Sequence, residues 1–306
     1  MNIFKKTTLA LAISALAGGA MAQSAPAPAP APEKSPISAN VTVISSYAYR
    51  GLTQSNYRPA IQGGFDYAHE SGFYIGNWNS SISWISDGYY NATNQARSVS
   101  APIEMDFYAG FKKELIAEGF ATDIGVLQYY YPTTSMPGVS ATTATITANP
   151  TLRQVSGVNP NTTEVYLAQN FTAGAATGFL KFSYALTNLF GIYNSKGAFY
   201  PDLTVNYDTG IFGIALNAHI GYQYVPNNYT VTTANATANG IGAGTYNLSY
   251  ADWKLGFTKD FGGGLSGSVA YVGTNIQKVG NTYTYTTSNG GSAGKATGIV
   301  ALTKTF

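Results

Sequence analysis

Apolar and polar residues alternate along much of this chain, and this two-residue period is the feature that most limits its possible folds. In residues 103–112 every odd position is apolar, and the even positions are acidic, basic, glycine or tyrosine. The same split recurs at 61–67, 211–224 and 251–258. On a β-strand, alternate side chains point to opposite faces, whereas a helix would mix the two sets. The pattern therefore predicts sheets with one apolar face and one polar face.

Repeated along the chain, the alternation predicts about twelve strands. We expect them at 40–50, 60–69, 72–84, 103–115, 120–131, 163–174, 178–187, 198–208, 211–224, 248–259, 265–275 and 295–306. A tilted strand needs about 9–11 residues to cross a bilayer, and these segments are long enough.

Two kinds of connection alternate between the expected strands. Short ones with a glycine in or beside them lie at 70–71, 116–119, 175–177, 209–210 and 260–264. Long ones rich in Asn, Thr, Ser, Gly and Pro lie at 51–59, 85–102, 132–162, 188–197, 225–247 and 276–294. Outer-membrane barrels place short turns in the periplasm and long loops outside. Residues 37–306 are therefore predicted to be all-β, as an antiparallel transmembrane β-barrel; a soluble β-sandwich would require neither this alternation nor an even strand number.

The N-terminal residues read as an export signal. Lysines at 5 and 6 precede a short apolar run at 9–17 and an Ala-Met-Ala motif at 20–22, which predicts a cleaved signal peptide over residues 1–22. The run is too short to span a membrane as a helix. Residues 23–36 carry Ala-Pro repeats, which favour an extended conformation, and we interpret them as a periplasmic linker. The expected location is the bacterial outer membrane.

Composition excludes several classes of function. The signal peptide takes two of the 16 basic residues, which leaves 14 against 14 acidic residues, so nothing suggests a nucleic-acid partner. With no cysteine, the chain has no disulfide, thiolate nucleophile or cysteine-ligated metal. Metal-ligand spacings and phosphate-binding loops are also missing from the sequence. We therefore expect no catalytic residue, no metal and no cofactor.

The first strands carry a family signature. Residues 46–55 read SYAYRGLTQS, residues 59–66 read PAIQGGFD, and residues 71–78 read SGFYIGNW. This segment resembles the TorF family of proteobacterial porins, also named Gcw_chp. Weaker likeness at 104–110, 129–132, 164–166 and 304–306 extends the resemblance over most of the mature chain, but not over the long loops. The resemblance implies an outer-membrane barrel with a pore and leaves the transported solute open.

Charged and amide side chains on the polar face are the candidate pore-lining residues. They are Arg50, Asp66, Asn77, Asn79, Glu104, Asp106, Lys112, Asp123, Glu164, Lys181, Asp202, Asn217, His219, Asp252 and Lys254. With both termini in the periplasm, odd-numbered strands run outward, and the outer half of the lumen is then net acidic. Carboxylates in a pore favour cations, so one hypothesis is a mild cation preference at the outer mouth. The alternative is that these charges pair across strands and only solvate the interior.

Three residue groups allow two interpretations each. Arg50 is either a constriction residue facing carboxylates such as Glu104 and Asp106, or a structural ion pair where the first hairpin leaves the barrel. His69-Glu70-Ser71 offers catalytic residue types, but adjacent side chains diverge in a turn, so we do not expect the three to meet. Tyrosines at the predicted outer strand ends, at positions 47, 49, 129, 130, 131, 222 and 224, are expected to form an aromatic girdle. For inward tyrosines such as Tyr108 and Tyr200, the alternative is stacking against a sugar in the lumen.

Together these observations predict an outer-membrane porin, a passive diffusion channel for small hydrophilic solutes. Its expected partners are outer-membrane lipid, lipopolysaccharide and the solutes themselves. The alternative is a non-conducting surface protein whose long loops bind a partner or stabilise the envelope. An outer-membrane enzyme is a third and weaker interpretation.

The last residue generates a prediction about assembly. Phe306 closes an apolar face that includes Val300 and Leu302, and we expect the barrel-assembly machinery to meet the terminal strand there. Deleting Phe306 should lower the amount of folded protein in the outer membrane, measured by heat-modifiable gel shift, because the signal for insertion is lost. The barrels that do fold should keep the conductance of the full chain; a normal yield would contradict the prediction.

Overall fold

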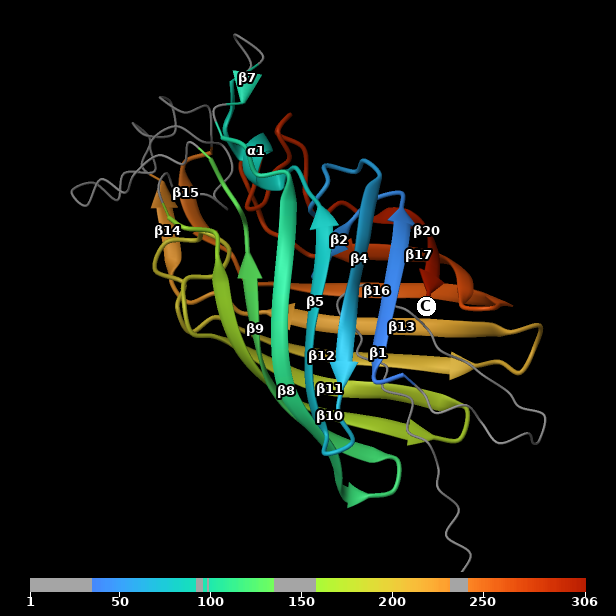
Figure 1. Ribbon diagram of the computed structural model, residues 1–306. Coiled ribbons are helices and arrows are strands. Elements are labelled where there is room, and N and C mark those ends of the chain that lie inside the picture. The colour runs from blue at the N-terminus through green and yellow to red at the C-terminus, as the bar shows by residue number, and fades with distance from the viewer. Residues whose placement is uncertain (1–34, 92–95, 98, 135–157, 232–241) are drawn as a thin grey trace, which may run out of the picture.

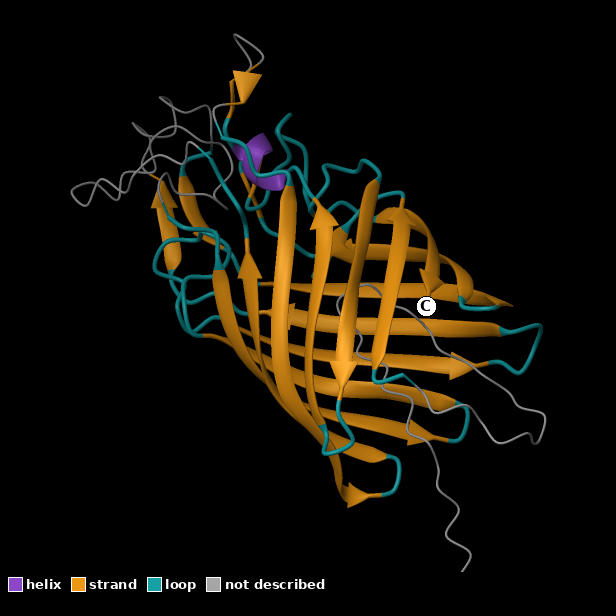
Figure 2. Cartoon of the chain, in the orientation of Figure 1, coloured by secondary structure: helices purple, strands orange, loops and turns teal. Residues whose placement is uncertain are grey.

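A computed structural model shows the chain as a closed antiparallel β-barrel (Figures 1 and 2). The structure describes residues 35–91, 96–97, 99–134, 158–231 and 242–306. The predicted signal peptide, most of the linker and most of the predicted loop 132–162 lie outside the described residues. All statements below that something is absent concern the described residues alone.

Twelve strands make the barrel wall, as the alternation predicts. They are β1 (Ile37–Ile44), β4 (Ala60–Ala68), β5 (Phe73–Ser81), β8 (Ile103–Ala117), β9 (Phe120–Tyr130), β10 (Thr162–Ala173), β11 (Ala176–Ala185), β12 (Phe199–Asp208), β13 (Ile214–Gln223), β16 (Tyr250–Gly262), β17 (Leu265–Thr274) and β20 (Thr297–Thr305). Each pairs with its neighbours in this order, and β1 pairs with β20 to close the ring. Phe306 extends that seam, because its backbone N–H donates to the carbonyl of Ala39 at 2.8 Å.

The connections alternate in length around the ring. Short turns at 69–72, 118–119, 174–175, 209–213 and 263–264 lie at one end of the barrel, here called the turn end. The opposite end, the loop end, carries the long connections (upper left in Figure 1). The predicted pattern of short turns and long loops is thereby confirmed.

Several loops hold small elements that the strand pattern did not predict. They are the hairpins β2 (Ala48–Tyr49) with β3 (Leu52–Thr53), β6 (Tyr90–Asn91) with β7 (Ala96–Arg97), β14 (Asn228–Val231) with β15 (Gly244–Asn247) and β18 (Lys278–Val279) with β19 (Thr282–Tyr283), and the one-turn helix α1 (Trp84–Gly88). The first barrel strand consequently ends at Ile44, six residues before the predicted boundary at Arg50. In the part of the chain that the structure describes, no helix is long and apolar enough to cross a membrane.

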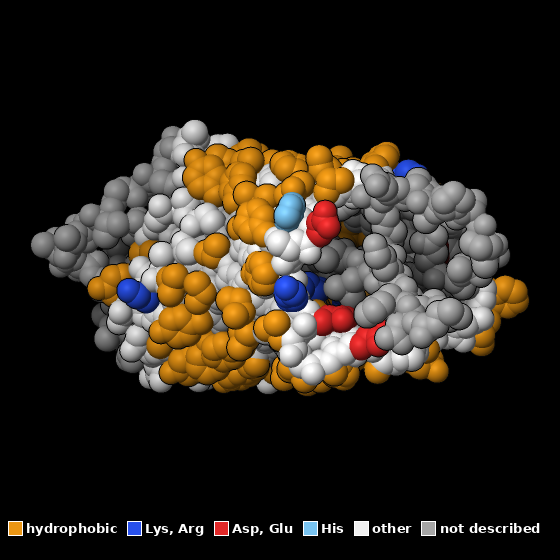
Figure 3. Space-filling model, turned by 60° about the horizontal axis from the view of Figure 1, so that its bottom comes forward, with side chains coloured by type: hydrophobic (Ala, Val, Ile, Leu, Met, Phe, Trp, Pro, Cys, Tyr) orange, Lys and Arg blue, Asp and Glu red, His pale blue; other side chains and the backbone are white. Residues whose placement is uncertain are grey.

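The outer wall of the barrel is apolar. Large hydrophobic side chains such as Ile61, Leu255 and Val269 are more than half exposed there, and Figure 3 shows such side chains over much of the wall. A water-soluble protein rarely exposes a continuous apolar surface of this kind. A closed barrel satisfies its backbone hydrogen bonds between strands, so this wall suits a lipid environment.

A charge on this wall should weaken the fold according to its depth. Leu255, near the middle of β16, is 55 % exposed, and replacing it with arginine should cost about 2–4 kcal/mol of unfolding free energy in phospholipid vesicles. Phe212 in the turn at 209–213 is 82 % exposed and serves as the control; Phe212→Arg should cost about 0–1 kcal/mol. Urea titration followed by tryptophan fluorescence measures both, and equal costs would contradict a lipid-facing wall.

Candidate functional site

The polar face of the strands points into the barrel, as expected. Most of the predicted lumen residues lie there: Asp66, Glu104, Asp106, Lys112, Asp123, Glu164, Lys181, Asp202, Asn217, His219, Asp252 and Lys254 alternate with the exposed apolar residues of their strands. Arg50 joins them from the β2–β3 hairpin rather than from a barrel strand.

Asn77 and Asn79 lie on the outer face instead, so the sequence-based placement of these two was wrong. Asn77 pairs directly with Phe65 and with Phe107, both outward-facing, and cross-strand partners share a face. The two amides bond to each other at 2.5 Å, and Asn77 also donates to the carbonyl of Asp106 at 3.1 Å. These contacts satisfy part of the amide groups on a wall that is otherwise apolar, while Oδ1 of Asn79 has no partner among the described residues. Polarity alone had indicated the lumen for both residues.

The β2–β3 hairpin folds into the barrel and crosses its lumen. Its tip, Arg50-Gly51, is a two-residue turn in which both residues have positive φ, +45° and +74°. That geometry belongs to a type I′ turn, which favours Asn-Gly, and a left-handed arginine costs about 1–3 kcal/mol. A Cβ on Gly51 would lie 2.7 Å from Cβ of Asp252 in β16, so the tip lies against the wall three strands away from β1.

Arg50 is held by residues of the far wall. Its Nη2 lies 2.7 Å from Oε2 of Glu164 in β10, and its Nη1 donates to Oε1 of Gln223 in β13 at 2.6 Å. The guanidinium also lies over the rings of Tyr49 and Tyr200, at 4.9 and 4.2 Å from their centroids. An ion pair therefore exists, as the structural interpretation of Arg50 predicts. The carboxylate that Arg50 faces is Glu164 and not Glu104 or Asp106, the examples named for a constriction, because strand register is not readable from the sequence.

The charge of Arg50 is maintained despite burial, since only 7 % of the residue is exposed. Burial alone would lower the pKa of the guanidinium, but the Glu164 carboxylate raises it well above its ordinary value. Arg50 is thus a permanent cation buried in the loop-end half of the barrel.

Tyrosines fill most of the space around this hairpin. The hydroxyls of Tyr47 and Tyr131 each donate to Glu104 at 2.5 Å, and the hydroxyls of Tyr49 and Tyr129 lie 2.5 Å apart. These four rings are buried inside the barrel, so the predicted girdle was wrong for them. Tyr130, Tyr222 and Tyr224 do face outward. An aromatic residue at a strand end thus points either into the barrel or toward lipid, depending on whether its position alternates with the inward or the outward residues of the strand.

Asp106 differs from its neighbours because its carboxylate lacks a donor. The residue is 1 % exposed, and neither carboxyl oxygen has a hydrogen-bond partner among the described residues. It lies two positions from Glu104 on the inner face of β8 and directly opposite Tyr129. A buried carboxyl group without a partner is costly, so Asp106 marks a place where the described residues leave a polar group of the interior unsatisfied.

A second cluster surrounds His219. Its Nδ1 lies 3.0 Å from Oδ1 of Asp202, and its Nε2 lies 2.8 Å from Oδ1 of Asp252. The hydroxyl of Tyr200 donates to Asp252 at 2.8 Å, which connects this cluster to Arg50. Since carboxylates engage both ring nitrogens, His219 has no free nitrogen to act as a general base.

The turn-end half of the interior is more open and carries both charges. Lys112 and Asp123 are direct cross-strand partners, and the Tyr74 hydroxyl donates to Asp123 at 2.6 Å. Lys181 lies 4.1 Å from the ring centroid of Tyr166. Lys112, Asp123 and Lys181 are half-buried here, although Tyr74 is 1 % exposed, whereas Glu104 and Asp252 in the loop-end half are each 1 % exposed. The charged side chains at the turn end are therefore more accessible than those at the loop end.

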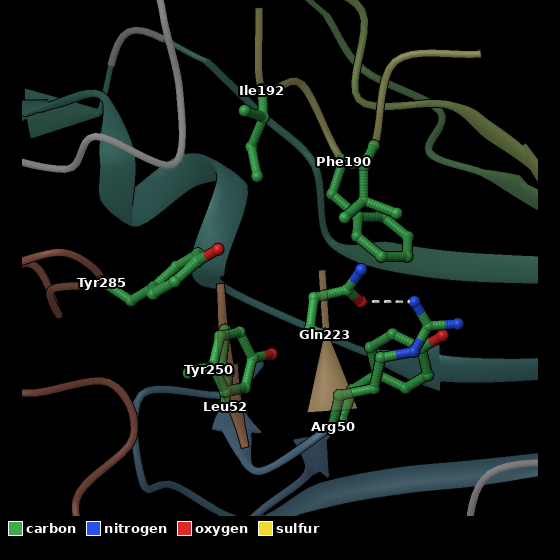
Figure 4. Close-up of a pocket in the computed structure, with 9 residues that line it drawn as sticks. Arg50, Leu52, Phe190, Ile192, Gln223, Tyr250 and Tyr285 are labelled. Atoms are coloured by element: carbon green, nitrogen blue, oxygen red, sulfur yellow. Dashed lines mark hydrogen bonds between the residues drawn. The ribbon is translucent and has the colours of Figure 1, made fainter. Parts of the chain in front are cut away.

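A small pocket lies beside Arg50 at the loop end (Figure 4). Arg50 and Gln223 form one side, and the other walls are apolar and aromatic. They consist of Tyr49, Leu52, Leu189, Phe190, Ile192, Tyr250 and Tyr285. About 20 Å³ is free for the centres of water molecules, which is room for one or two waters.

Residues 69–71 form an exposed turn. His69 Nδ1 lies 2.9 Å from the Ser71 hydroxyl, so two of the three side chains meet. Among the described contacts, no hydrogen bond or ion pair joins Glu70 to either of them. In the ranges that the structure describes, no group of three or more histidine and acidic side chains could hold a metal ion.

The geometry can now be compared with known proteins. The Gcw_chp family model, described as bacterial protein of unknown function, matches residues 29–306. This chain belongs to the Gcw_chp family. No curated protein matches its sequence.

Several solved barrels are similar to this chain at low identity. The KdgM porin is 6 % identical, with 88 % of this chain and 98 % of that chain covered and a TM-score of 0.46. OprD of Pseudomonas aeruginosa is 10 % identical, with 90 % of this chain and 66 % of that chain covered and a TM-score of 0.36. OccAB1 of Acinetobacter baumannii is 9 % identical, with 86 % and 60 % covered and a TM-score of 0.41. This chain thus spans less than two thirds of OprD and of OccAB1, and the likeness concerns the barrel alone.

Cysteine labelling tests which residues face the lumen, since the chain has no cysteine of its own. Asp123→Cys should react with a charged, membrane-impermeant maleimide in barrels reconstituted in vesicles, because its side chain borders the open turn-end half. Asn77→Cys on the outer face should react at least about tenfold more slowly, because lipid excludes a charged reagent. Mass spectrometry gives both rates. Fast labelling of Asn77→Cys would contradict the outer-face position of Asn77 and indicate that it faces the lumen.

Proposed function

We propose that this protein is a narrow outer-membrane channel for small hydrophilic solutes. The observation that carries the proposal is the inner face, which bears polar and charged side chains from the turn end to the Arg50 contact. Twelve strands give a barrel between the filled eight-stranded barrels and the open 16-stranded porins, so a narrow lumen is expected. The turn end would face the periplasm, and lipid and lipopolysaccharide would surround the wall.

We further propose a mild preference for cations. Within the closed loop-end half, the described carboxyl side chains that line the interior include Glu104, Asp106, Glu164 and Asp252. Arg50 contacts Glu164 and the imidazole of His219 contacts Asp252, and the acidic side chains that remain favour cations. The pairs Lys112 with Asp123 and Lys181 with Asp202 support the other interpretation, since opposite charges face each other there.

The closed loop end favours a second candidate function. Inward residues of this half are almost completely buried, and the hairpin tip contacts the far wall. A barrel that never opens would be a non-conducting surface protein whose loops bind a partner or stabilise the envelope. Catalysis is not part of either proposal, since His219 is held between two carboxylates.

Conductance separates the two candidates. The channel should pass small, cation-selective currents in planar bilayers under a KCl gradient, and Arg50→Ala should raise its conductance several-fold by releasing the hairpin tip. Lys113→Ala is a matched removal of a positive charge at an exposed, outward-facing position of β8 and should leave conductance unchanged. Silence of both wild type and Arg50→Ala in folded barrels would favour the surface protein, and anion-selective currents would contradict the proposed preference.

A further inference from the structure

The place that holds Arg50 has the chemistry of a binding site for a cationic solute. Three wall strands supply it: Glu164 from β10 accepts from one guanidinium nitrogen, Gln223 from β13 accepts from another, and Tyr200 from β12 covers the face. None of these three belongs to the hairpin that carries Arg50. The receptor is therefore part of the barrel, and the side chain in it is delivered by a loop.

We propose that this receptor recognises solutes with a guanidinium or primary amine group, and that Arg50 occupies it as a tethered substitute that the solute displaces. The inference rests on the proposed channel function and names the class of solute. A planar guanidinium matches paired oxygen acceptors with an aromatic face, and an ammonium can use the same carboxylate and ring less completely.

The conformation of Arg50 supports displacement. Arginine takes the first central position of a type I′ turn, where its φ of +45° is unfavourable for a residue with a side chain. Asparagine or glycine would make the same turn with less strain. The arginine is therefore explained by its contacts with the far wall rather than by the turn, and its release would relax the hairpin.

Asp106 supports the binding of a further positive charge. Its carboxylate is buried and without a hydrogen-bond partner among the described residues, in the same half of the lumen as Glu104 and Glu164. Arg50 satisfies Glu164 but no described contact joins it to Asp106. A cationic solute that enters this half would lower the electrostatic cost of that carboxylate.

The pocket beside Arg50 offers room for the rest of such a solute. Its walls are apolar and aromatic, which suits the hydrocarbon stem attached to a cationic head. With the hairpin in place it holds one or two waters, but Tyr49 and Leu52 belong to the hairpin itself. Displacement of the hairpin would enlarge the pocket and open the lumen together, so the solute that binds would also open its path.

Chemical rescue tests the receptor. In detergent, ethylguanidinium at millimolar concentration should raise the melting temperature of Arg50→Ala barrels by several degrees, because it replaces the lost head group. N-ethylurea, which has a similar shape but no charge, should not. Wild type, with its site filled, and the double variant Arg50→Ala/Glu164→Gln should not respond. Equal responses to both compounds, or an undiminished response of the double variant, would overturn the proposal.

Bilayer recordings test the same site in the channel. Ethylguanidinium should block Arg50→Ala currents with a half-blocking concentration at least about tenfold lower than in the double variant, which corresponds to the loss of about 1.4 kcal/mol of binding. Arg50→Asn, which suits the turn and leaves the receptor without a cation, replaces Arg50→Ala if the latter gives no heat-modifiable band, and the same contrasts apply to it. If the variants conduct but ethylguanidinium does not block Arg50→Ala more strongly than the double variant, the receptor is contradicted and the proposed channel function still holds. Rescue without current in any variant would support the receptor and contradict the channel.

Discussion

Closure of the ring is the constraint on which the rest of this structure depends. In lipid every backbone N–H and C=O must find its partner within the protein, and a sheet meets that demand only without free edges. Strands β1 and β20 supply the last seam, with Asn40 opposite Thr305 and Thr42 bonded to Thr303 across 261 residues of sequence. With the ring closed, alternate residues must face lipid and lumen, and every charged strand residue is assigned a side.

A closed ring of this size leaves an interior that side chains and one hairpin can fill. The protein fills it unequally. Tyr47 and Tyr131 bind Glu104, and Arg50 binds Glu164, so the loop end has a core of rings and buried charges. Near the turn end, side chains such as Lys112 and Asp123 line the wall and are more accessible. The molecule thus resembles a cup whose closed end is held by polar contacts together with a cluster of buried aliphatic and aromatic side chains.

The sequence predicted the wall far better than its contents. Period, loop alternation and strand number follow from local rules that each strand obeys on its own, and they were confirmed. Asn77 was misplaced because its polarity indicated the lumen while its parity with Phe73 and Ile75 indicated lipid. Tyr47 and Arg50 were assigned to a barrel strand because alternation continues past Ile44, although the chain there turns into the lumen. The partner of Arg50 could not be predicted, since it depends on register between strands far apart in sequence.

Gly51 shows how sterics and charge are coupled at the hairpin tip. Its missing side chain lets the backbone lie against Asp252 and Thr274, where a Cβ would come within 2.7 and 2.4 Å of their side-chain atoms. The depth of the hairpin is therefore fixed by an absent methyl group, and that depth sets the reach of Arg50 to Glu164. A single methyl at position 51 would act as a spacer that lifts the guanidinium from its carboxylate. The electrostatics of the lumen could thus be retuned without adding or removing any charge.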